Sequence, residues 1–140
     1  TQMFEKLEDL KSLAKNTKVQ GKPAHSDPEV RRTIARFETK IAAMKYNGLR
    51  YLTKQIRGEP LTSETSVNKL HRASLEIGMD DFAVELAGQA GLQLNGGNEA
   101  VDGGTWAKSA LNWPNVVIGG GTPNIQKNII AERILGQPKD

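Results

Sequence analysis

The fold is decided by one continuous stretch, residues 27–60, which reads DPEVRRTIARFETKIAAMKYNGLRYLTKQIRGEP. Asp27-Pro28-Glu29 signals a helix start, because it supplies a capping carboxylate, a proline at the first helical position and an acid in the first turn. Gly58-Glu59-Pro60 stops the helix. Between these signals, apolar side chains recur every three or four residues, at Val30, Ile34, Phe37, Ile41, Met44, Leu52 and Ile56. This spacing predicts a long amphipathic helix.

A second long helix follows, with Thr62 or Ser63 as its cap and an end near residues 89–92. Its broad apolar face comes from Val67, Leu70, Leu75, Phe82, Val84 and Leu86. Two long helices joined by a short Gly-Pro turn lie antiparallel. On the N-terminal side, residues 3–15 carry one apolar face opposite lysines and glutamates, which predicts another helix. A polar loop, residues 16–26, joins it to the first long helix.

The rest of the chain predicts an irregular crossover and one more helix. Residues 93–121 are rich in glycine and lack periodicity, so we expect a long loop that Trp106 and Trp113 order by packing. Thr122-Pro123 then starts a helix that ends at Gly136. The predicted fold is all-α: an up-down four-helix bundle with a long glycine-rich crossover loop before the last helix. We expect no convincing β-sheet and a single domain over residues 1–140.

Composition excludes several classes of function. The net charge of +3 is spread over 19 cations and 16 anions, so we expect no nucleic-acid partner. The chain has no cysteine, which excludes disulfides, zinc–thiolate sites and thiol catalysis and fits a reducing compartment. No apolar run approaches the ~20 residues that a membrane-spanning helix needs. We therefore expect a cytoplasmic protein without membrane contact.

The most suggestive chemistry lies at residues 119–123, Gly-Gly-Gly-Thr-Pro. Glycines let the backbone come close to a ligand, and a helix N-terminus presents free N–H groups that suit a phosphate, a carboxylate or a thioester oxygen. A flexible turn before an ordinary capped helix explains the same residues. The spacing is neither a dinucleotide fingerprint nor a P-loop, because no strand precedes it and no Gly-Lys-Ser/Thr follows.

Residues 120–136, GGTPNIQKNIIAERILG, resemble the closing helix of acyl-CoA dehydrogenases, Gly-Thr-x-x-Ile-Gln-Arg-x-x-Ile-Ala-x-x-x-Leu-Gly. Pro138-Lys139 follows, as is common in that family. Two upstream segments are similar and in the same order. Residues 21–23 match the family's Phe-Gly-Lys/Arg-Pro loop, although Gln20 replaces its aromatic residue and Thr17-Lys18 replaces its usual arginine. Residues 84–91, VELAGQAG, resemble Val-Gln-x-x-Gly-Gly-x-Gly.

The resemblance implies a bacterial flavoenzyme that removes the α and β hydrogens of an acyl-CoA and passes electrons to an electron-transfer flavoprotein. FAD would lie between a β-domain and this bundle, in a homodimer, homotetramer or heterotetramer. Cofactor contacts are implied at Thr122 and Asn124. The adenine and pyrophosphate of a partner subunit's FAD are implied at Glu85, Gly88 and Gln89, although glutamine is usual at position 85. Substrate contacts are implied at Gly120 and Gly121.

The resemblance leaves this chain without a catalytic residue of its own. Many members have Tyr-Glu-Gly-Thr, whose glutamate removes the α-proton, whereas here Gly120 stands at the glutamate position. Isovaleryl and certain long-chain types place the glutamate on an earlier helix, which would begin upstream of Thr1 together with an α-helical and a β-domain. Alternatively, the chain is the inactive subunit of a heteromeric enzyme, such as those that dismantle steroid side chains. An autonomous helical interaction module is a third reading.

Other polar residues predict surface positions. His25 and His71 are far apart in the pattern and lack carboxylate neighbours at ligand spacing, so we expect no metal site. Asp80-Asp81 predicts solvated positions near a partner interface, since adjacent helical residues point about 100° apart. A basic helix face and two further cations are expected to be solvated: Arg31, Arg32, Arg36 and Lys40, then Arg57 and Lys69.

Overall fold

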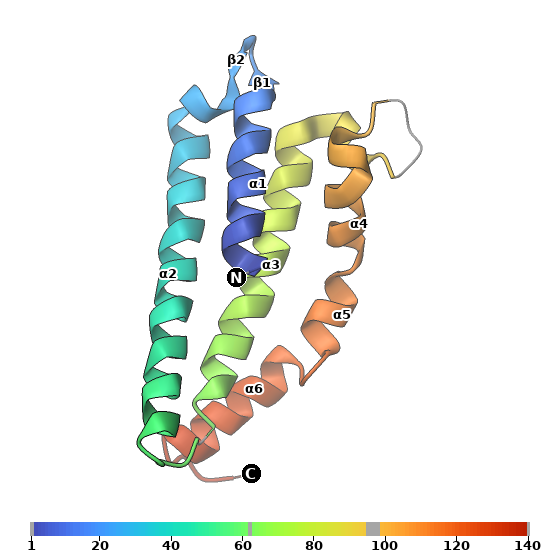
Figure 1. Ribbon diagram of the computed structural model, residues 1–140. Helices are drawn as coiled ribbons and strands as arrows, with labels where there is room; N and C mark the ends of the chain where they lie inside the picture. The colour runs from blue at the N-terminus through green and yellow to red at the C-terminus, as the bar shows by residue number, and fades with distance from the viewer. Residues whose placement is uncertain (1, 62, 95–98, 140) are drawn as a thin grey trace.

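Three long helices form the body of the molecule (Figure 1). The structure is a computed structural model that describes residues 2–61, 63–94 and 99–139. The helices are α1 (Gln2–Asn16), α2 (Pro28–Ile56) and α3 (Thr65–Ala87). They alternate up and down, and the shorter α1 lies beside the upper parts of α2 and α3 (Figure 1). The prediction of an all-α, up-down helical bundle is confirmed.

The start and end of α2 are those that the sequence predicts. The Asp27 carboxylate accepts hydrogen bonds from the backbone N–H groups of Glu29 and Val30, at 2.7 Å and 3.2 Å, which completes the cap. The helix ends at Ile56, and Gly58 takes a positive φ of 72° in the turn that follows. Local hydrogen bonding therefore sets both ends of this helix.

The boundaries of α3 differ from the prediction. Residue 62 lies outside the described residues, and Ser63 does not cap the helix; Glu64 precedes its first turn without a side-chain cap. The helix ends at Ala87 because Gly88 adopts a positive φ of 62°, and a 3₁₀ turn, η2 (Gly88–Leu92), follows. The end near residues 89–92 is therefore corrected to residue 87.

The predicted polar loop between α1 and α2 contains a small hairpin. Its strands are β1 (Lys18–Val19) and β2 (Lys22–Pro23), which pair antiparallel with Lys18 opposite Pro23. Gln20 and Gly21 form a two-residue turn with positive φ values of 51° and 78°, as tight hairpin turns require. A 3₁₀ turn, η1 (Ala24–Ser26), then leads into α2. The two strands have two residues each, so they do not change the fold class.

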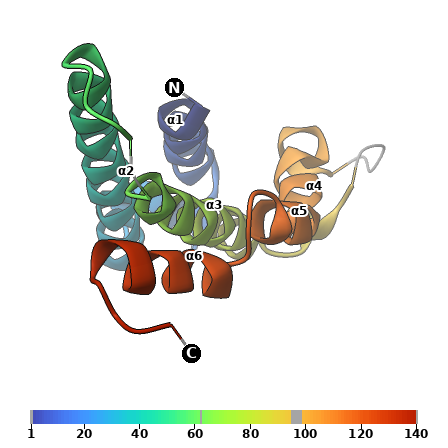
Figure 2. The same ribbon diagram turned by 90° about the horizontal axis from the view of Figure 1, so that it is seen from below.

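The crossover after α3 is helical where the sequence predicts an irregular loop. It consists of η3 (Val101–Gly104), α4 (Thr105–Leu111) and α5 (Trp113–Ile118), which descend along α3 (Figure 1). Helices of seven and six residues are too short to produce a readable apolar period. The last helix, α6 (Pro123–Ile129), continues as a π-helical turn, η4 (Ile130–Ile134), and crosses beneath α3 (Figure 2).

One apolar core joins α1, α2, α3 and α4. The side chains buried there share an inward position on their helices: Leu7, Leu10, Leu13, Phe37, Ile41, Leu75, Met79, Ala83 and Trp106. Trp106 packs the crossover, as predicted. Trp113 does not, because 53% of its surface is exposed at the start of α5. The expectation that both tryptophans are packed is therefore wrong for Trp113.

Candidate functional site

The turn between α5 and α6 has a conformation that requires glycine. Gly120 and Gly121 have φ values of 73° and 100°, a region that side chains rarely adopt. A Cβ atom at position 121 would also lie 2.6 Å from Nε2 of Gln126. Glycine at position 121 is therefore needed both for its φ and for the close approach of a neighbouring side chain.

Gln126 holds this turn in place from the first turns of α6. Its side chain is 6% exposed, and Nε2 donates a hydrogen bond of 2.7 Å to the carbonyl of Gly120. A buried amide needs such a partner, so the bond ties the helix to the glycine turn. Sequence reasoning used this glutamine only as part of a motif and missed its role. Its place, five residues after the last glycine, was the available signal.

Thr122 and Asn124 flank the turn as the sequence predicts. The Thr122 hydroxyl accepts a long hydrogen bond, 3.4 Å, from the N–H of Ile125, which confirms the predicted cap. Asn124 is exposed in the first turn of α6, and Gly120 is exposed beside it. Four predicted site residues therefore lie together at one end of the bundle: Gly120, Gly121, Thr122 and Asn124.

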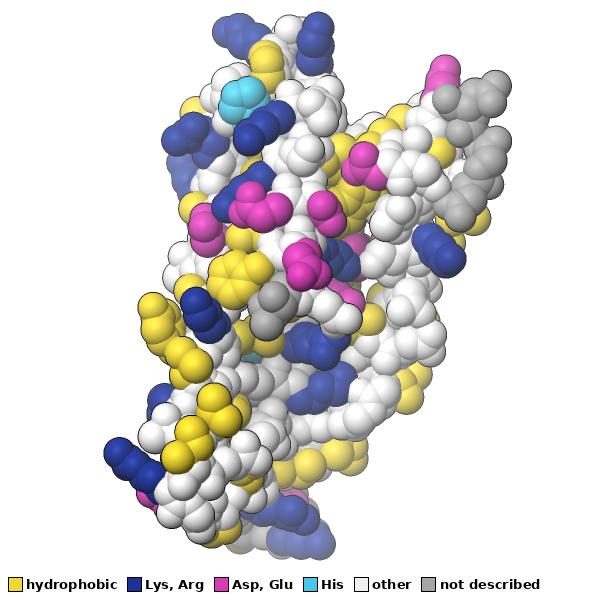
Figure 3. Space-filling view, viewed as in Figure 1, with side chains coloured by type: hydrophobic (Ala, Val, Ile, Leu, Met, Phe, Trp, Pro, Cys, Tyr) yellow, Lys and Arg dark blue, Asp and Glu magenta, His cyan; other side chains and the backbone are white. Residues whose placement is uncertain are grey.

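A groove of about 360 Å³ runs between α3 and α5 next to this turn. Figure 3 shows a hollow there in which Lys and Arg side chains gather. Five polar residues line it, namely Lys69, Arg72, Glu76, Asn112 and Asn115. Ala73, Val116 and Gly119 complete the lining. Sequence analysis did not predict this groove, because its two sides come from segments about forty residues apart.

Lys69 faces the groove and contacts its far side. Its Nζ donates a hydrogen bond of 2.8 Å to the carbonyl of Val116 on α5. A Cβ atom at position 120 would lie 3.4 Å from Cε of Lys69. The expectation that Lys69 is a solvated surface residue is therefore wrong, because the helix turns it toward α5. Arg57, by contrast, is exposed as expected.

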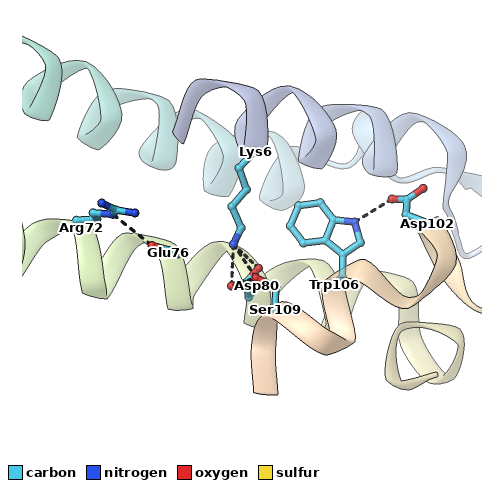
Figure 4. Close-up of polar contacts among 7 residues, drawn as sticks. All are labelled: Lys6, Arg72, Glu76, Asp80, Asp102, Trp106 and Ser109. Atoms are coloured by element: carbon cyan, nitrogen blue, oxygen red, sulfur yellow. Dashed lines mark hydrogen bonds and ion pairs between the residues drawn. The ribbon is translucent and has the colours of Figure 1, made fainter. Parts of the chain in front are cut away.

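A buried ion pair joins three helices close to the groove (Figure 4). Asp80 on α3 is 2% exposed, and Lys6 on α1 places Nζ 2.7 Å from Oδ1 and 2.8 Å from Oδ2. Ser109 on α4 donates a hydrogen bond of 2.9 Å to Oδ2. Of the two Lys6 contacts, only the one to Oδ2 has hydrogen-bond geometry. The contact of Lys6 with Oδ1 is therefore an ionic one without a hydrogen bond. Burial raises the pKa of Asp80, and Lys6 partly opposes that rise.

The ion pair corrects the expectation that Asp80 and Asp81 are both solvated. Asp81 is exposed, but Asp80 points inward toward α1 and α4. Its neighbour Trp106 donates a hydrogen bond of 2.9 Å from Nε1 to Asp102 (Figure 4). No short-range pattern in the sequence indicates either contact, because Lys6 lies 74 residues away from Asp80.

The other predicted cofactor residues lie at the opposite end of α3. Glu85 is in the last turn of α3, and Gly88 and Gln89 follow in η2; all three are exposed. Lys69 and Glu85 are sixteen residues apart on one helix, which is about 24 Å at 1.5 Å per residue. The structure therefore separates the predicted site residues into two clusters.

Further polar residues lie where the sequence predicts. His25 and His71 are exposed. The basic face of α2 is exposed as well, and it consists of Arg31, Arg32, Arg36 and Lys40.

In the described part of the chain, no group of three or more His, Cys, Asp or Glu side chains is placed to hold a metal ion. No helix among the described residues is both long enough and apolar enough to cross a bilayer.

Comparison with known proteins matches nearly the whole chain to one family. Residues 2–135 fit the family model described as Acyl-CoA dehydrogenase, C-terminal domain. Acyl-CoA dehydrogenase IpdE1 of Mycobacterium tuberculosis is 29% identical over 134 residues, or 96% of this chain and 32% of that protein. Its namesake from Mycolicibacterium smegmatis is 33% identical over 132 residues, or 94% and 30%. The chain thus spans about a third of the length of these curated relatives.

Solved structures have the same fold. The crystal structure of the ChsE4-ChsE5 complex from Mycobacterium tuberculosis is similar with a TM-score of 0.83 and 23% identity. The similarity covers 99% of this chain and 36% of that one. This likeness shows that the helices have the same arrangement in both proteins.

Proposed function

Because the chain belongs to the acyl-CoA dehydrogenase family, as its C-terminal domain, we propose that it forms the flavin-flanking helical part of an enzyme that dehydrogenates an acyl-CoA thioester. The observation that carries the proposal is the Gly120-Gly121 turn held by Gln126. Gly120 is exposed in this turn, and Thr122 and Asn124 lie beside it. The family is flavin-dependent, and FAD when bound supplies the acceptor for the hydride that leaves the β-carbon.

The chain's own residues fit FAD at the first cluster. The hydroxyl of Thr122 caps α6 by accepting a long hydrogen bond of 3.4 Å, so it can also donate a hydrogen bond to a ligand. Asn124 offers an exposed amide with both donor and acceptor atoms. We assign these two side chains to orienting FAD, and Gly120 and Gly121 to contact with the acyl group of the substrate.

The second cluster serves a different FAD in this proposal. Gly88 and Gln89 follow Glu85, which lies about 24 Å along α3 from Lys69, and they would hold the adenine and pyrophosphate of a neighbouring subunit's cofactor. An exposed carboxylate at Glu85 repels a pyrophosphate, so we give Glu85 the weakest part in this contact. The assignment implies a homodimer, a homotetramer or a heterotetramer, with an electron-transfer flavoprotein as electron acceptor.

The α-proton needs a base that Gly120 cannot supply. Glu76 is the carboxylate that lines the groove, but its Oε2 lies 3.5 Å from Nε of Arg72. We therefore place the base on a helix earlier in the whole protein. The absence of a side chain at position 120 also favours a second candidate function, the non-catalytic subunit of a heteromeric dehydrogenase.

The test uses the full-length protein that contains this domain. We expect it to purify with flavin absorbance, and Asn124→Ala to lower flavin retention about tenfold through loss of a polar contact. Asn128→Ala is the matched control, because Asn128 is an exposed asparagine on the same helix one turn further along. Absence of flavin from the full-length protein would contradict the proposal and favour an autonomous interaction module.

A second measurement separates the two candidate functions. Anaerobic addition of an acyl-CoA should bleach the flavin if the protein carries its own base. Replacing the glutamate on the earlier helix by glutamine should then abolish bleaching without releasing flavin. Bleaching that appears only after a second, different subunit is added would support the heteromeric alternative.

A further inference from the structure

The groove beside the glycine turn carries a net positive charge. Lys69 Nζ donates a hydrogen bond to a neutral group, the carbonyl of Val116. Among the described residues, no carboxylate oxygen lies within 4.0 Å of this ammonium group. Arg72 lies one turn further along α3 and meets Glu76 at 3.5 Å, with half of its side chain exposed. Two cations and one carboxylate therefore line the groove.

The place of Gly120 explains this imbalance. A side chain at position 120 would begin 3.4 Å from Cε of Lys69, so a carboxylate there would lie within reach of the ammonium group. Glycine leaves that space empty of charge. Lys69 thus faces a position where an anion is stabilised and where the chain supplies none.

The lining of the groove disfavours a plain alkyl chain. Asn112 and Asn115 on one side and Glu76 on the other present polar atoms, whereas Ala73 and Val116 are its apolar lining residues. An unbranched hydrocarbon would remove these amides and charges from water without replacing their hydrogen bonds. A ligand with its own charged oxygen atoms would accept hydrogen bonds from the amides and from the cations of the groove.

We propose that this groove binds an acyl-CoA whose acyl group carries a carboxylate, which pairs with Lys69 in the space left by Gly120. Arg72 strengthens the positive field from the next turn of α3. The inference rests on the proposed function, and it adds the substrate class: a dicarboxylic acyl group attached to CoA through one of its two carboxyls.

The experiment measures binding of matched thioesters to the full-length protein by titration calorimetry. The pairs are succinyl-CoA with butyryl-CoA and adipoyl-CoA with hexanoyl-CoA, each equal in carbon number. We expect the carboxylate-bearing member of at least one pair to bind about tenfold more tightly, the gain of one charge-assisted contact. Equal binding within both pairs would overturn the inference.

Variants identify the residue responsible. Lys69→Met should remove the preference, whereas Lys69→Arg, which keeps the cation, should retain most of it. Lys40→Met is the control, since it makes the same charge change on an exposed part of α2 away from the groove. A preference that survives Lys69→Met in a folded protein, checked by circular dichroism, would also overturn the inference.

Flavin absorbance shows whether a negative result contradicts only the inferred carboxylate preference or also the proposed function. Bound flavin without a carboxylate preference would remove this inference and leave the proposed function intact. A carboxylate preference in a protein that never holds flavin would contradict the proposed function and support the groove. A protein that binds neither thioester pair would contradict both.

Discussion

The upper and lower halves of the bundle differ although α2 and α3 run through both. In the upper half, α1 and α4 cover the long helices, and Leu10, Leu75 and Met79 are fully buried. The shorter helix α1 does not extend into the lower half. There Leu49, Leu52 and Ile56 remain exposed along α2. The spacing of apolar residues along α2 is the same in both halves. The two halves therefore differ in burial because only the upper part of α2 has a further helix, α1, packed against it.

This contrast indicates that the upper half is stabilised by its own packed core, whereas the lower half presents an apolar surface to another molecule or domain. Exposed apolar stripes of this kind are typical of protein–protein surfaces. The turn between α5 and α6 and α6 itself lie beside the open half (Figure 1). The groove between α3 and α5 adjoins that turn at Gly119. The contacts proposed for FAD at Thr122 and Asn124 and for the acyl group therefore belong to the half that the chain leaves uncovered. The contact proposed for a neighbouring subunit's FAD lies instead at the upper end of α3.

The largest expected effect compares one leucine from each half. Leu75→Ala should lower the free energy of unfolding by about 3–4 kcal/mol, because it removes buried apolar surface and leaves a cavity. Leu52→Ala, at a position 50% exposed, should cost less than about 1 kcal/mol. Urea denaturation of the two variants measures this difference. Equal losses would mean that the lower half is packed as tightly as the upper.

The next effect concerns the two lysines of α1. Lys6→Met should cost about 3 kcal/mol, because it leaves the buried Asp80 carboxylate without its cation. Lys11→Met removes an ion pair with Glu8 and Glu38 at the surface and should cost less than about 1 kcal/mol. The same denaturation measurement applies. A Lys6→Met loss no larger than that of Lys11→Met would show that the buried pair contributes nothing special.

A smaller effect is expected at the glycine turn. Gly121→Ala should cost about 2 kcal/mol, since it combines an unfavourable φ with a Cβ that displaces Gln126. Gly136→Ala shares the positive φ but has open space around it, so it should cost about 1 kcal/mol. Thermal unfolding of both variants compares them. Identical values would assign the whole cost to the backbone and none to Gln126.

The smallest effect is a dependence of stability on pH. Burial raises the pKa of Asp80 above its ordinary value of 3.8, so the folded chain binds this proton more tightly than the unfolded chain. The stability that Asp80 contributes is then complete below the unfolded pKa and is lost as pH rises through the folded pKa.

Asp80→Asn cannot titrate and isolates this contribution. The stability of the natural chain minus that of the variant should fall as pH rises from about 3 to about 7. Urea denaturation at several pH values measures it. A difference that rises over this interval would mean that Lys6 lowers the pKa of Asp80 by more than burial raises it.

The sequence by itself determined the parts of this protein that depend on neighbouring residues. Asp27 caps α2, Thr122 caps α6, and the apolar spacing of α1, α2 and α3 identifies three helices. Each signal acts through hydrogen bonds or side-chain periodicity within a few residues, so a linear pattern contains it. The same holds for the glycine turn, where the needed residue types are adjacent.

Only the tertiary structure decided which polar residues are buried and which come together. The sequence predicts solvated positions for Asp80 and Lys69, yet one pairs with α1 and the other contacts α5. It likewise predicts packing for Trp113, which is exposed. The contacts of Lys69 and Asp80 depend on partners 47 and 74 residues away, whose positions follow from helix packing. A periodic pattern shows which face of a helix is apolar, but only packing determines what that face and its edges meet.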